Sequence, residues 1–372
     1  MRYSSSAPEI LASGNRPSQN ELPEISVIDS SAENEQLKNE INDFIDKRIP
    51  RLLKKFYKST ALPQVKVYLK KLMLYSAIKQ TLNEYYLNSE DLKNIVADIA
   101  MIVRERVNPS CFFSSKRINR EKEIDKLSAL IGSPKVESPF KNINELFDHC
   151  YNTYPSVQKF CIAMDLDDTL YDSHSKKLIL EEQHQALLFV ARRLGGKVVF
   201  ATFRPAPESD TSGRGHAMTI RNKLISNASF HFCGNDIQRK FTKKINDENY
   251  QLISDVFYTN GKSKLPVLEF IASHAEMDGE LKSECVLLCD DQPPEGIHNS
   301  GFAFLHVPAF DEYGEIKNME DTKESIPLSQ PEYLDHFIKF LIERSEAQHF
   351  YAEHLNSLQE NSSVLSNDLA MG

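Results

Sequence analysis

The chain has 372 residues, enough for one large hydrophobic core and a second folded part. Its composition is that of a globular protein, and its net charge of −9 argues against general nucleic-acid binding. The N-terminus lacks the apolar core of a signal peptide, and no apolar run is long enough for a membrane span. Six cysteines without a CxxC pair suit reduced thiols, so we expect a cytoplasmic protein.

The first part of the chain divides into two segments. Residues 1–34 are rich in Ser, Pro, Asn and Glu and poor in large apolar residues, so they are predicted to form a disordered leader. Over 35–150, apolar residues recur at helical spacing, and Pro50 and Pro63 interrupt the pattern. This segment is therefore predicted to be an all-helical module.

Positive charge is concentrated in part of that helical segment. Between Asp46 and Glu84 there are ten Lys or Arg residues and no acidic residue. They are Lys47, Arg48, Arg51, Lys54, Lys55, Lys58, Lys66, Lys70, Lys71 and Lys79. From Lys47 to Lys79 these charges alternate with Leu, Phe and Tyr, a pattern that can bind an anionic membrane or an acidic partner. A solvated basic face on a helical bundle is the alternative interpretation.

The pattern changes over 157–310, where continuous apolar runs alternate with helical patterns. Such runs indicate central parallel strands that are buried on both faces. The runs are 160–164, 197–203, 229–233, 284–289 and 301–307. Helical patterns cover 180–194 and 264–274, and Gly195-Gly196 would end the first of them. This alternation predicts an α/β fold with a doubly wound, Rossmann-like parallel sheet.

The last part of the chain, 311–372, is less regular. Its residues 331–359 could form one long helix, with Leu334, Phe337 and Leu341 on one face. The residues after 359 are mostly polar, so we expect a C-terminal helix followed by a loose tail.

Polar residues follow three of the predicted strands. Asp165 and Asp167 come after the first strand, Thr202 ends the second, and Asp290-Asp291 follow the fourth. Because ligands bind beyond the carboxyl ends of parallel strands, we expect these side chains to converge.

A lysine ahead of the 264–274 helix is predicted to join this group. Lys264 fits better than Lys262, because Leu268 and Ile271 follow it as a helical stripe, but Lys262 is close enough to replace it.

The gathered carboxylates predict a bound cation. Two carboxylates 4 Å apart repel each other by about 1 kcal/mol in water and by about 4 kcal/mol at an effective dielectric constant of about 20. The candidate ligands are all oxygens, and no His or Cys lies at suitable spacing. Oxygen ligands of this kind favour Mg²⁺.

These residues, in this order, resemble the four motifs of the haloacid dehalogenase superfamily. The motifs are Asp165-x-Asp167-x-Thr169, Thr202, Lys264 and Asp290-Asp291. The resemblance covers 157–310 and implies an Mg²⁺-dependent phosphatase that is preceded by an unrelated helical module. An acidic residue at the second motif position favours phosphatase or phosphotransferase chemistry over dehalogenation.

The resemblance also implies a role for each residue. Asp165 would attack phosphorus and become an aspartyl phosphate, and Asp167 would act as general acid and then as general base. Thr202 and Lys264 would hold the phosphoryl oxygens. The implied Mg²⁺ ligands are the carboxylates of Asp165, Asp290 and Asp291, with the main-chain carbonyl of Asp167.

Neighbouring polar residues are interpreted more conservatively. Asp168 is expected to be solvated, since alternate residues of an extended strand point away from the site. Arg204 could reach a substrate phosphate or form a structural salt bridge. Asp172, His174 and His216 are expected on surface loops at the rim.

The motif spacings leave room for little or no cap domain. An open site admits bulky substrates, so a phosphoprotein carrying phosphorylated Ser, Thr or Tyr is favoured over a metabolite. The alternatives are a small-molecule phosphate monoester phosphatase and a non-catalytic binding protein that uses its basic helices. A capless core between a helical module and a polar tail also resembles a bacterial secreted effector, which would act after translocation into a host cell.

Overall fold

The computed structural model describes residues 32–105, 114–131, 137–152, 160–172, 176–206, 216–225, 235–274, 281–307 and 332–370. Its helices are α1 (Ala32–Lys58), α2 (Leu62–Glu84), α3 (Ser89–Arg104), α4 (Ser114–Leu130), α5 (Ile143–Asn152), α6 (Glu181–Arg193), α7 (His216–Leu224), α8 (Asn235–Ile245), α9 (Leu265–His274), α10 (Glu332–Ser345) and α11 (Ala347–Ala370). Its strands are β1 (Cys161–Met164), β2 (Tyr171–Asp172), β3 (Lys177–Leu178), β4 (Lys197–Thr202), β5 (Gln251–Ile253), β6 (Val256–Tyr258), β7 (Val286–Asp290) and β8 (Ala303–His306).

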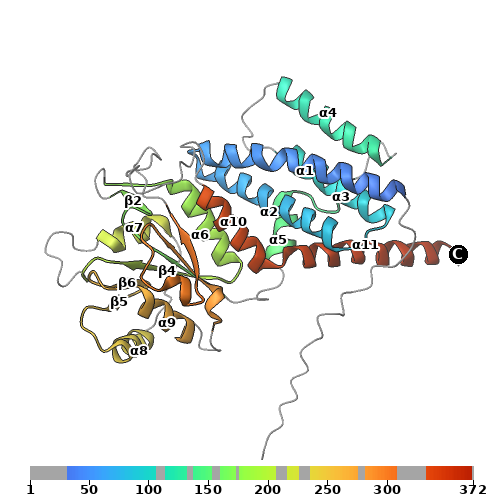
Figure 1. The fold of residues 1–372 in the computed structure, drawn as a ribbon. Helices are drawn as coiled ribbons and strands as arrows, with labels where there is room; N and C mark the ends of the chain where they lie inside the picture. Colours follow the sequence, from blue (N-terminus) through green and yellow to red (C-terminus); the bar gives the residue numbers. More distant parts are fainter. Residues whose placement is uncertain are drawn as a thin grey trace, which may run out of the picture.

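The centre of the fold is a six-stranded sheet in the order β5-β6-β4-β1-β7-β8 (Figure 1). All neighbouring strands are parallel except β5 and β6, which form an antiparallel edge. Strand β1 lies between β4 and β7, with Met164 in register with Phe200 on one side and Cys289 on the other. The three central strands therefore end at one edge. The predicted α/β class and the mostly parallel sheet are confirmed.

Four of the five predicted strands are present as β1, β4, β7 and β8, and the fifth, 229–233, lies outside the described residues. The place beside β4 is taken by β6, which was not predicted. Strands β5 and β6 each have three residues and are joined by a tight turn at Ser254, whose φ is 59°. Runs this short carry too little periodicity to be recognised in a sequence.

Alternation along the strands divides the core between the two faces of the sheet. Ile162 and Met164 of β1 pack in the core shared with α6, α7 and α10. Cys161 and Ala163 point to the opposite side, where Phe241 of α8 and residues of α9 cover the sheet. Helices thus cover both faces of the sheet, as expected for buried parallel strands.

Two glycines set the distance between α6 and the sheet. The amides of Gly195 and Gly196 donate to the carbonyls of Arg192 (3.0 Å) and Ala191 (2.9 Å), and Gly195 has a φ of 81°. These are the bonds of a Schellman motif, so the predicted end of this helix is confirmed. A Cβ atom at Gly196 would lie 2.3 Å from the Phe160 ring, so only glycine allows β4 to start beside β1.

The described residues of the segment from α1 to α5 form helices, but Pro50 does not end a helix. It lies inside α1, which continues to Lys58. Pro63 falls in the first turn of α2, where a missing N–H costs nothing. The hydrogen bond that Pro50 removes from α1 is offset by packing on both sides of it, where Ile45 and Phe56 are fully buried.

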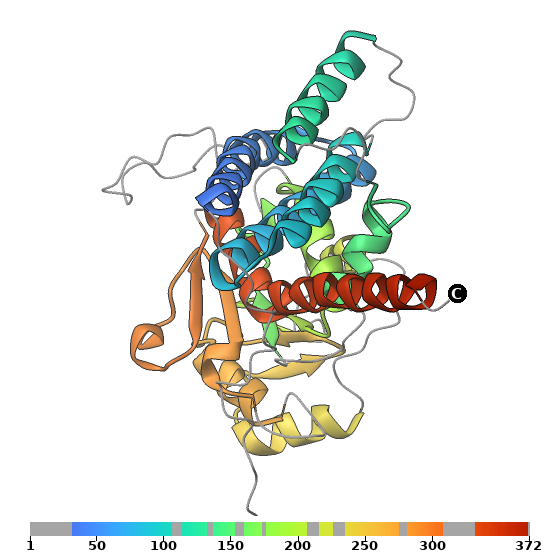
Figure 2. The ribbon, with the colours of Figure 1, turned by 90° about the vertical axis from the view of Figure 1, so that its right-hand side faces the viewer.

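The C-terminal stretch forms two helices instead of the single helix expected over 331–359. The break is at Glu346, whose φ of 49° ends α10 before α11 begins. Helix α11 then extends to Ala370, through residues expected to be loose. Helix α10 lies between α2 and the sheet, and α11 packs on α2 and α5 (Figures 1 and 2). One continuous apolar core therefore joins the helices of 32–152 to one face of the sheet.

Among the described residues, no helix combines the length and the apolar character that crossing a membrane requires. The cysteines that the structure describes, Cys150, Cys161, Cys285 and Cys289, are buried free thiols.

Candidate functional site

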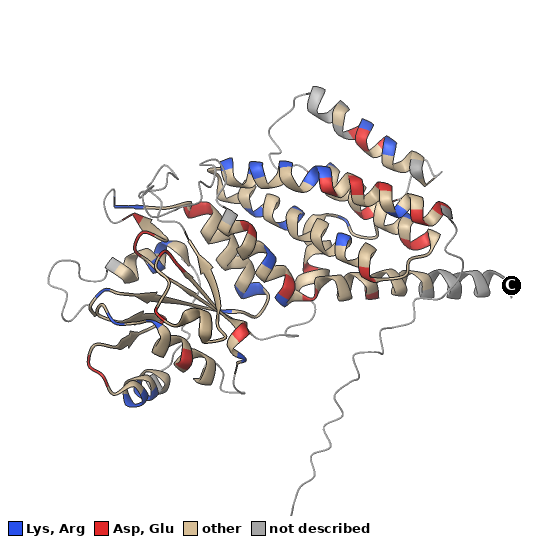
Figure 3. Cartoon of the chain, viewed as in Figure 1, with Lys and Arg blue, Asp and Glu red and all other residues tan. Residues whose placement is uncertain are grey.

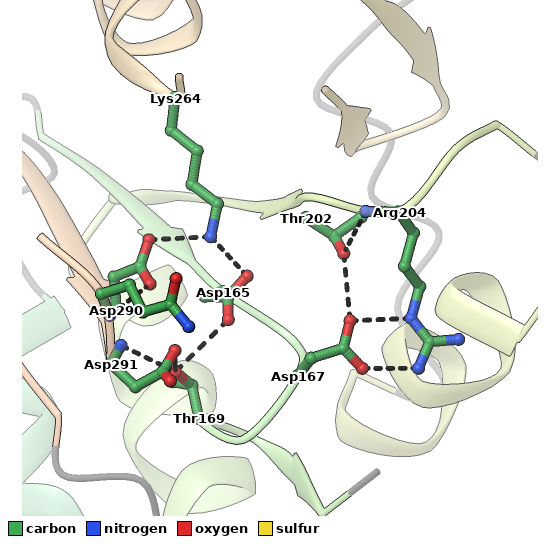
Figure 4. A network of polar contacts seen from close by, with 9 residues as sticks. Asp165, Asp167, Thr169, Thr202, Arg204, Lys264, Asp290 and Asp291 are labelled. Atoms are coloured by element: carbon green, nitrogen blue, oxygen red, sulfur yellow. Dashed lines mark hydrogen bonds and ion pairs between the residues drawn. The ribbon is translucent and has the colours of Figure 1, made fainter. Parts of the chain in front are cut away.

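The candidate site lies at the carboxyl edge of the sheet, where β1, β4 and β7 end (Figure 4). Asp165 directly follows β1, and its amide donates to the carbonyl of Cys289 on β7 (2.9 Å). Thr202 and Asp290 are the last residues of β4 and β7. The parallel register of the strands thus brings together residues that are far apart in the sequence.

The most buried part of the site is an ion-paired triad. Lys264 Nζ lies 2.5 Å from Asp165 Oδ1 and 2.7 Å from Asp290 Oδ2, and all three side chains are almost completely inaccessible. Lys264 directly precedes α9, and its Nζ is also 4.3 Å from the centre of the Phe203 ring. Lys262, the other lysine considered, is exposed.

Burial dominates the electrostatics of this triad. It raises the pKa of Asp165 to about 8, although the Lys264 ammonium opposes the rise, and Asp290 adds to it. Burial works to lower the pKa of Lys264, but Asp165 and Asp290 together raise it above its ordinary value, so the ammonium stays charged. Burial also raises the pKa of Asp291 to about 6, and the nearby Asp290 contributes. One lysine therefore faces three carboxyl groups in a poorly solvated place.

Asp165, Asp290 and Asp291 offer carboxylate oxygens that all lie within 4.8 Å of one another. This spacing and the all-oxygen donor set fit a hard divalent cation, although they do not distinguish Mg²⁺ from other such ions. The second oxygen of Asp290 accepts a hydrogen bond from the Gln292 amide (3.0 Å), which fixes the orientation of the carboxylate. The group is defined by side-chain oxygens, so the expected contribution of the Asp167 main-chain carbonyl stays a prediction.

Asp167 and Thr202 form a second group beside the triad. Arg204 binds the Asp167 carboxylate through two bonds, from Nε (2.7 Å) and from Nη2 (2.5 Å). The Thr202 hydroxyl donates to Asp167 (3.4 Å) and accepts from the Arg204 amide (3.2 Å). Asp167 is about 30% exposed, so this pair faces the opening of the site while the triad lies deeper.

The loop that carries the first motif is held by its own backbone and by Thr169. Asp168 has a φ of 57°, in the left-handed region that Asp tolerates, and its amide donates to the Tyr171 carbonyl (2.7 Å). The fully buried Thr169 hydroxyl accepts from the Asp291 amide (3.1 Å) and lies 3.5 Å from Asp165 Oδ2. Thr169 thereby ties this loop to the end of β7.

The structure brings together every predicted site residue, in two groups: Asp165, Lys264, Asp290 and Asp291 in one, Asp167 and Thr202 in the other. Arg204, left open between two roles, forms the salt bridge with Asp167. The contacts of Thr169 with Asp165 and Asp291 were not predicted, although Thr169 was identified as the last residue of the first motif.

The residues expected at the rim have different outcomes. Asp172 is buried in β2, because β2 and β3 fold back as a hairpin on the first-motif loop, so the expectation of a surface position was wrong. His174 and the side chain of His216 lie outside the described residues.

Comparisons with protein-family models, with curated proteins and with solved structures found no match, so the chemistry of the site is inferred from its residues and geometry.

Proposed function

We propose that this protein is an Mg²⁺-dependent phosphatase of the haloacid dehalogenase type, which forms an aspartyl phosphate on Asp165. One observation carries the proposal: Lys264 is held between Asp165 and Asp290 at the carboxyl edge of the sheet, with Asp291 close enough to share a cation. A buried carboxylate beside a buried cation, at the place where α/β sheets bind ligands, is an arrangement suited to phosphoryl transfer.

The positions of the motifs in the fold support the proposal. The strand before Asp165 is central, with the strand of Thr202 on one side and the strand of Asp290 on the other. The β2–β3 hairpin follows the first motif directly, and Lys264 enters from the helix after β6. The four motifs therefore reach the carboxyl edge of the sheet from four different elements.

The side chains have complementary roles in the proposed reaction. Asp165 attacks the phosphorus of a monoester, and the bond between phosphorus and the leaving oxygen breaks as that oxygen takes a proton from Asp167. Asp167 then takes a proton from the water that hydrolyses the aspartyl phosphate. Lys264 and Thr202 hold the phosphoryl oxygens, and Arg204 orients Asp167. When bound by Asp165, Asp290 and Asp291, Mg²⁺ would neutralise charge on the phosphoryl group.

The described elements between β4 and Lys264 favour a bulky substrate. Helix α7 buries Ala217 and Ile220 in the core on one face of the sheet, and α8 buries Phe241 on the other. Because these helices cover the faces of the sheet, they do not roof its carboxyl edge. We therefore propose phosphorylated Ser, Thr or Tyr in a protein as the substrate, with a small phosphate monoester as the alternative.

Phosphate release from an aryl phosphate tests the proposal. The wild type and Asp165→Asn are compared with Mg²⁺ and with a chelator, and circular dichroism confirms that the variant is folded. We expect turnover by the wild type only with Mg²⁺, and a loss of at least about a thousandfold in the variant. Equal residual rates in both proteins would instead favour a non-catalytic binding protein.

A further inference from the structure

A stripe of positive charge runs along the C-terminal half of α1. Arg51, Lys54, Lys55 and Lys58 are spaced at i, i+3, i+4 and i+7, which places them on one helix face, and all four are exposed. The acidic residues of α1 lie in its N-terminal half (Figure 3). Within the described part of the chain, Arg51, Lys54 and Lys58 form no ion pair. We call these four residues the basic stripe.

Other basic residues of the same segment serve the fold instead. Lys71 is buried and donates to the carbonyls of Ile102 (2.6 Å) and Glu105 (2.9 Å), at the C-terminal end of α3. Arg48 pairs with Glu123, and Lys79 pairs with Asp46. Among the ten basic residues, Arg51, Lys54 and Lys58 of the basic stripe therefore carry charge that no ion pair within the described residues balances.

The structure fastens the C-terminal end of the basic stripe to α6. Gln183 Nε2, in the first turn of α6, donates to the carbonyls of Phe56 (2.8 Å), Tyr57 (3.3 Å) and Ser59 (2.9 Å) at the end of α1. These bonds satisfy carbonyls that a helix end leaves free. Gln183 is buried, so the link is a fixed part of the fold.

The β2–β3 hairpin lies in the sequence between Gln183 and the loop that carries the first motif. Its base is closed by the Ile179 amide, which donates to the Leu170 carbonyl (2.9 Å) directly after the first motif. Gln183 is five positions after Leu178, so its Cα lies within about 18 Å of the hairpin, and the end of α1 is bonded to its side chain. Figure 1 shows this end of α1 on the same side of the molecule as the hairpin.

We propose that the basic stripe binds an acidic segment of the phosphoprotein substrate, several residues away from the phosphorylated residue. This inference rests on the proposed phosphatase function. An extended peptide covers about 3.3 Å per residue, so about six residues span the distance of at most about 18 Å between the hairpin and Gln183. Arg51, Lys54 and Lys58, which share one face of α1, attract a run of Asp or Glu.

The burial of α1 favours a peptide over a membrane. A helix that inserts into a lipid surface presents an apolar face beside its basic face. In α1 the apolar side chains Ile45, Leu52 and Phe56 are buried in the core instead. The basic stripe therefore offers charge without an apolar surface, which suits a hydrated acidic peptide.

Matched triple variants of the full chain test the proposal. The test variant is Arg51→Gln with Lys54→Gln and Lys58→Gln. The control is Arg239→Gln with Lys240→Gln and Lys243→Gln, which removes the same charge from exposed residues of α8, on the other side of the sheet from α1 (Figure 3). Thermal melting confirms that both variants are folded.

The readout is the ratio of kcat/KM for two phosphopeptides. The two peptides contain the same phosphorylated residue. Five consecutive residues, the first of them four positions from the phosphorylated residue, are Asp in one peptide and Asn in the other. Peptides with this run before and after the phosphorylated residue are both tested. We expect the wild type to prefer the Asp peptide about tenfold at low salt and hardly at all at about 0.5 M salt. The test variant should lose the preference, and the α8 control should keep it.

A wild-type ratio near one would overturn the proposal, because the Asp run would then have no effect. Equal losses in both variants would also overturn it, because net charge alone would then explain the preference. Fluorescence anisotropy with an unphosphorylated Asp peptide separates this outcome from failure of the phosphatase function. Binding that is lost only in the α1 variant supports docking even if no phosphate is released. Binding of phosphatidylserine vesicles without binding of the Asp peptide would sink the proposal in favour of a membrane.

Discussion

Asp165 and Asp98 are both buried carboxyl groups, but they lie in different surroundings. Asp98, in the middle of α3, is completely buried and accepts hydrogen bonds from Ser138 Oγ (2.5 Å) and the Tyr351 hydroxyl (2.8 Å). Asp165 is paired with the Lys264 ammonium and shares its place with two other carboxylates. Burial raises the pKa of Asp98 to about 6 and that of Asp165 to about 8.

The difference separates a structural acid from one that we propose to be reactive. Near Asp98 the closest basic group is His354, 3.9 Å away, and burial lowers the pKa of that ring to about 4, so it is uncharged near neutral pH. Neutral hydroxyls then satisfy Asp98 and fix the packing of α3 against α11. At Asp165, by contrast, one ammonium group faces three carboxyl groups, an arrangement that would favour the cation of the proposed reaction.

The largest effect is expected where the lysine is removed. Lys264→Met leaves Asp165 facing Asp290 without a buried counter-charge, so the free energy of unfolding should fall by about 3–5 kcal/mol, and phosphatase activity should be lost. Urea unfolding measures the first effect and phosphate release the second. Lys262→Met is the matched control, because that lysine is exposed and should change the stability by less than about 0.5 kcal/mol.

A second variant tests the reason for that loss. If charge imbalance is the cause, adding Asp290→Asn to Lys264→Met should recover part of the lost stability without restoring activity. Additive losses in the double variant would mean that packing of the lysine, rather than its charge, stabilises the site.

Asp167 should matter to the reaction more than to the fold. Because Asp167 is proposed to protonate the leaving oxygen, Asp167→Asn should lower kcat about a hundredfold for an alkyl phosphate, a poor leaving group. The loss should be much smaller for an aryl phosphate whose leaving group needs no proton. Equal losses on both substrates would exclude the acid role.

The arginine partner of Asp167 should have a smaller effect. Arg204→Lys keeps the positive charge but loses the two-bonded geometry, so we expect about a tenfold loss of kcat on the alkyl phosphate. The stability should change by less than about 1 kcal/mol, because the Arg204–Asp167 pair is partly exposed. A stability loss as large as that of Lys264→Met would contradict the distinction between the two ion pairs.

The sequence predicts the site better than its surroundings. The positions of Asp165, Thr202 and Asp290 could be predicted because each lies at the end of a clear apolar run. The carboxyl ends of parallel strands meet at one edge of a sheet. The pairing of Asp167 with Arg204 could not, since it depends on side-chain rotamers and not on periodicity.

Parts of the fold were missed for related reasons. Strand β6 was too short to give a pattern, and the sequence did not say that α10 and α11 complete the helical layer. Contacts such as Tyr351 with Asp98 join residues far apart in the chain, and helical spacing alone does not identify which helices meet.

The smallest effect is expected at Asp98, and its sign depends on pH. The folded chain holds the Asp98 proton up to about pH 6, whereas an ordinary Asp releases it near 3.8. Between these values the folded state binds more protons than the unfolded state, so the free energy of unfolding falls as the pH rises from about 4 to about 6. In Asp98→Asn this dependence is absent.

Urea unfolding of the wild type and Asp98→Asn at intervals from pH 4 to pH 7.5 measures the difference. The Asn carbonyl can accept from one of Ser138 and Tyr351 and its NH2 group can donate to the other hydroxyl, and any difference in the strength of these bonds shifts the stability equally at every pH. Relative to the wild type, the variant should therefore gain about 2 kcal/mol between pH 4 and pH 6 and no more above it. Its phosphatase activity should match that of the wild type. Parallel pH profiles would mean that Asp98 is ionised throughout and that the helical layer tolerates a buried charge, as the candidate site does at Lys264.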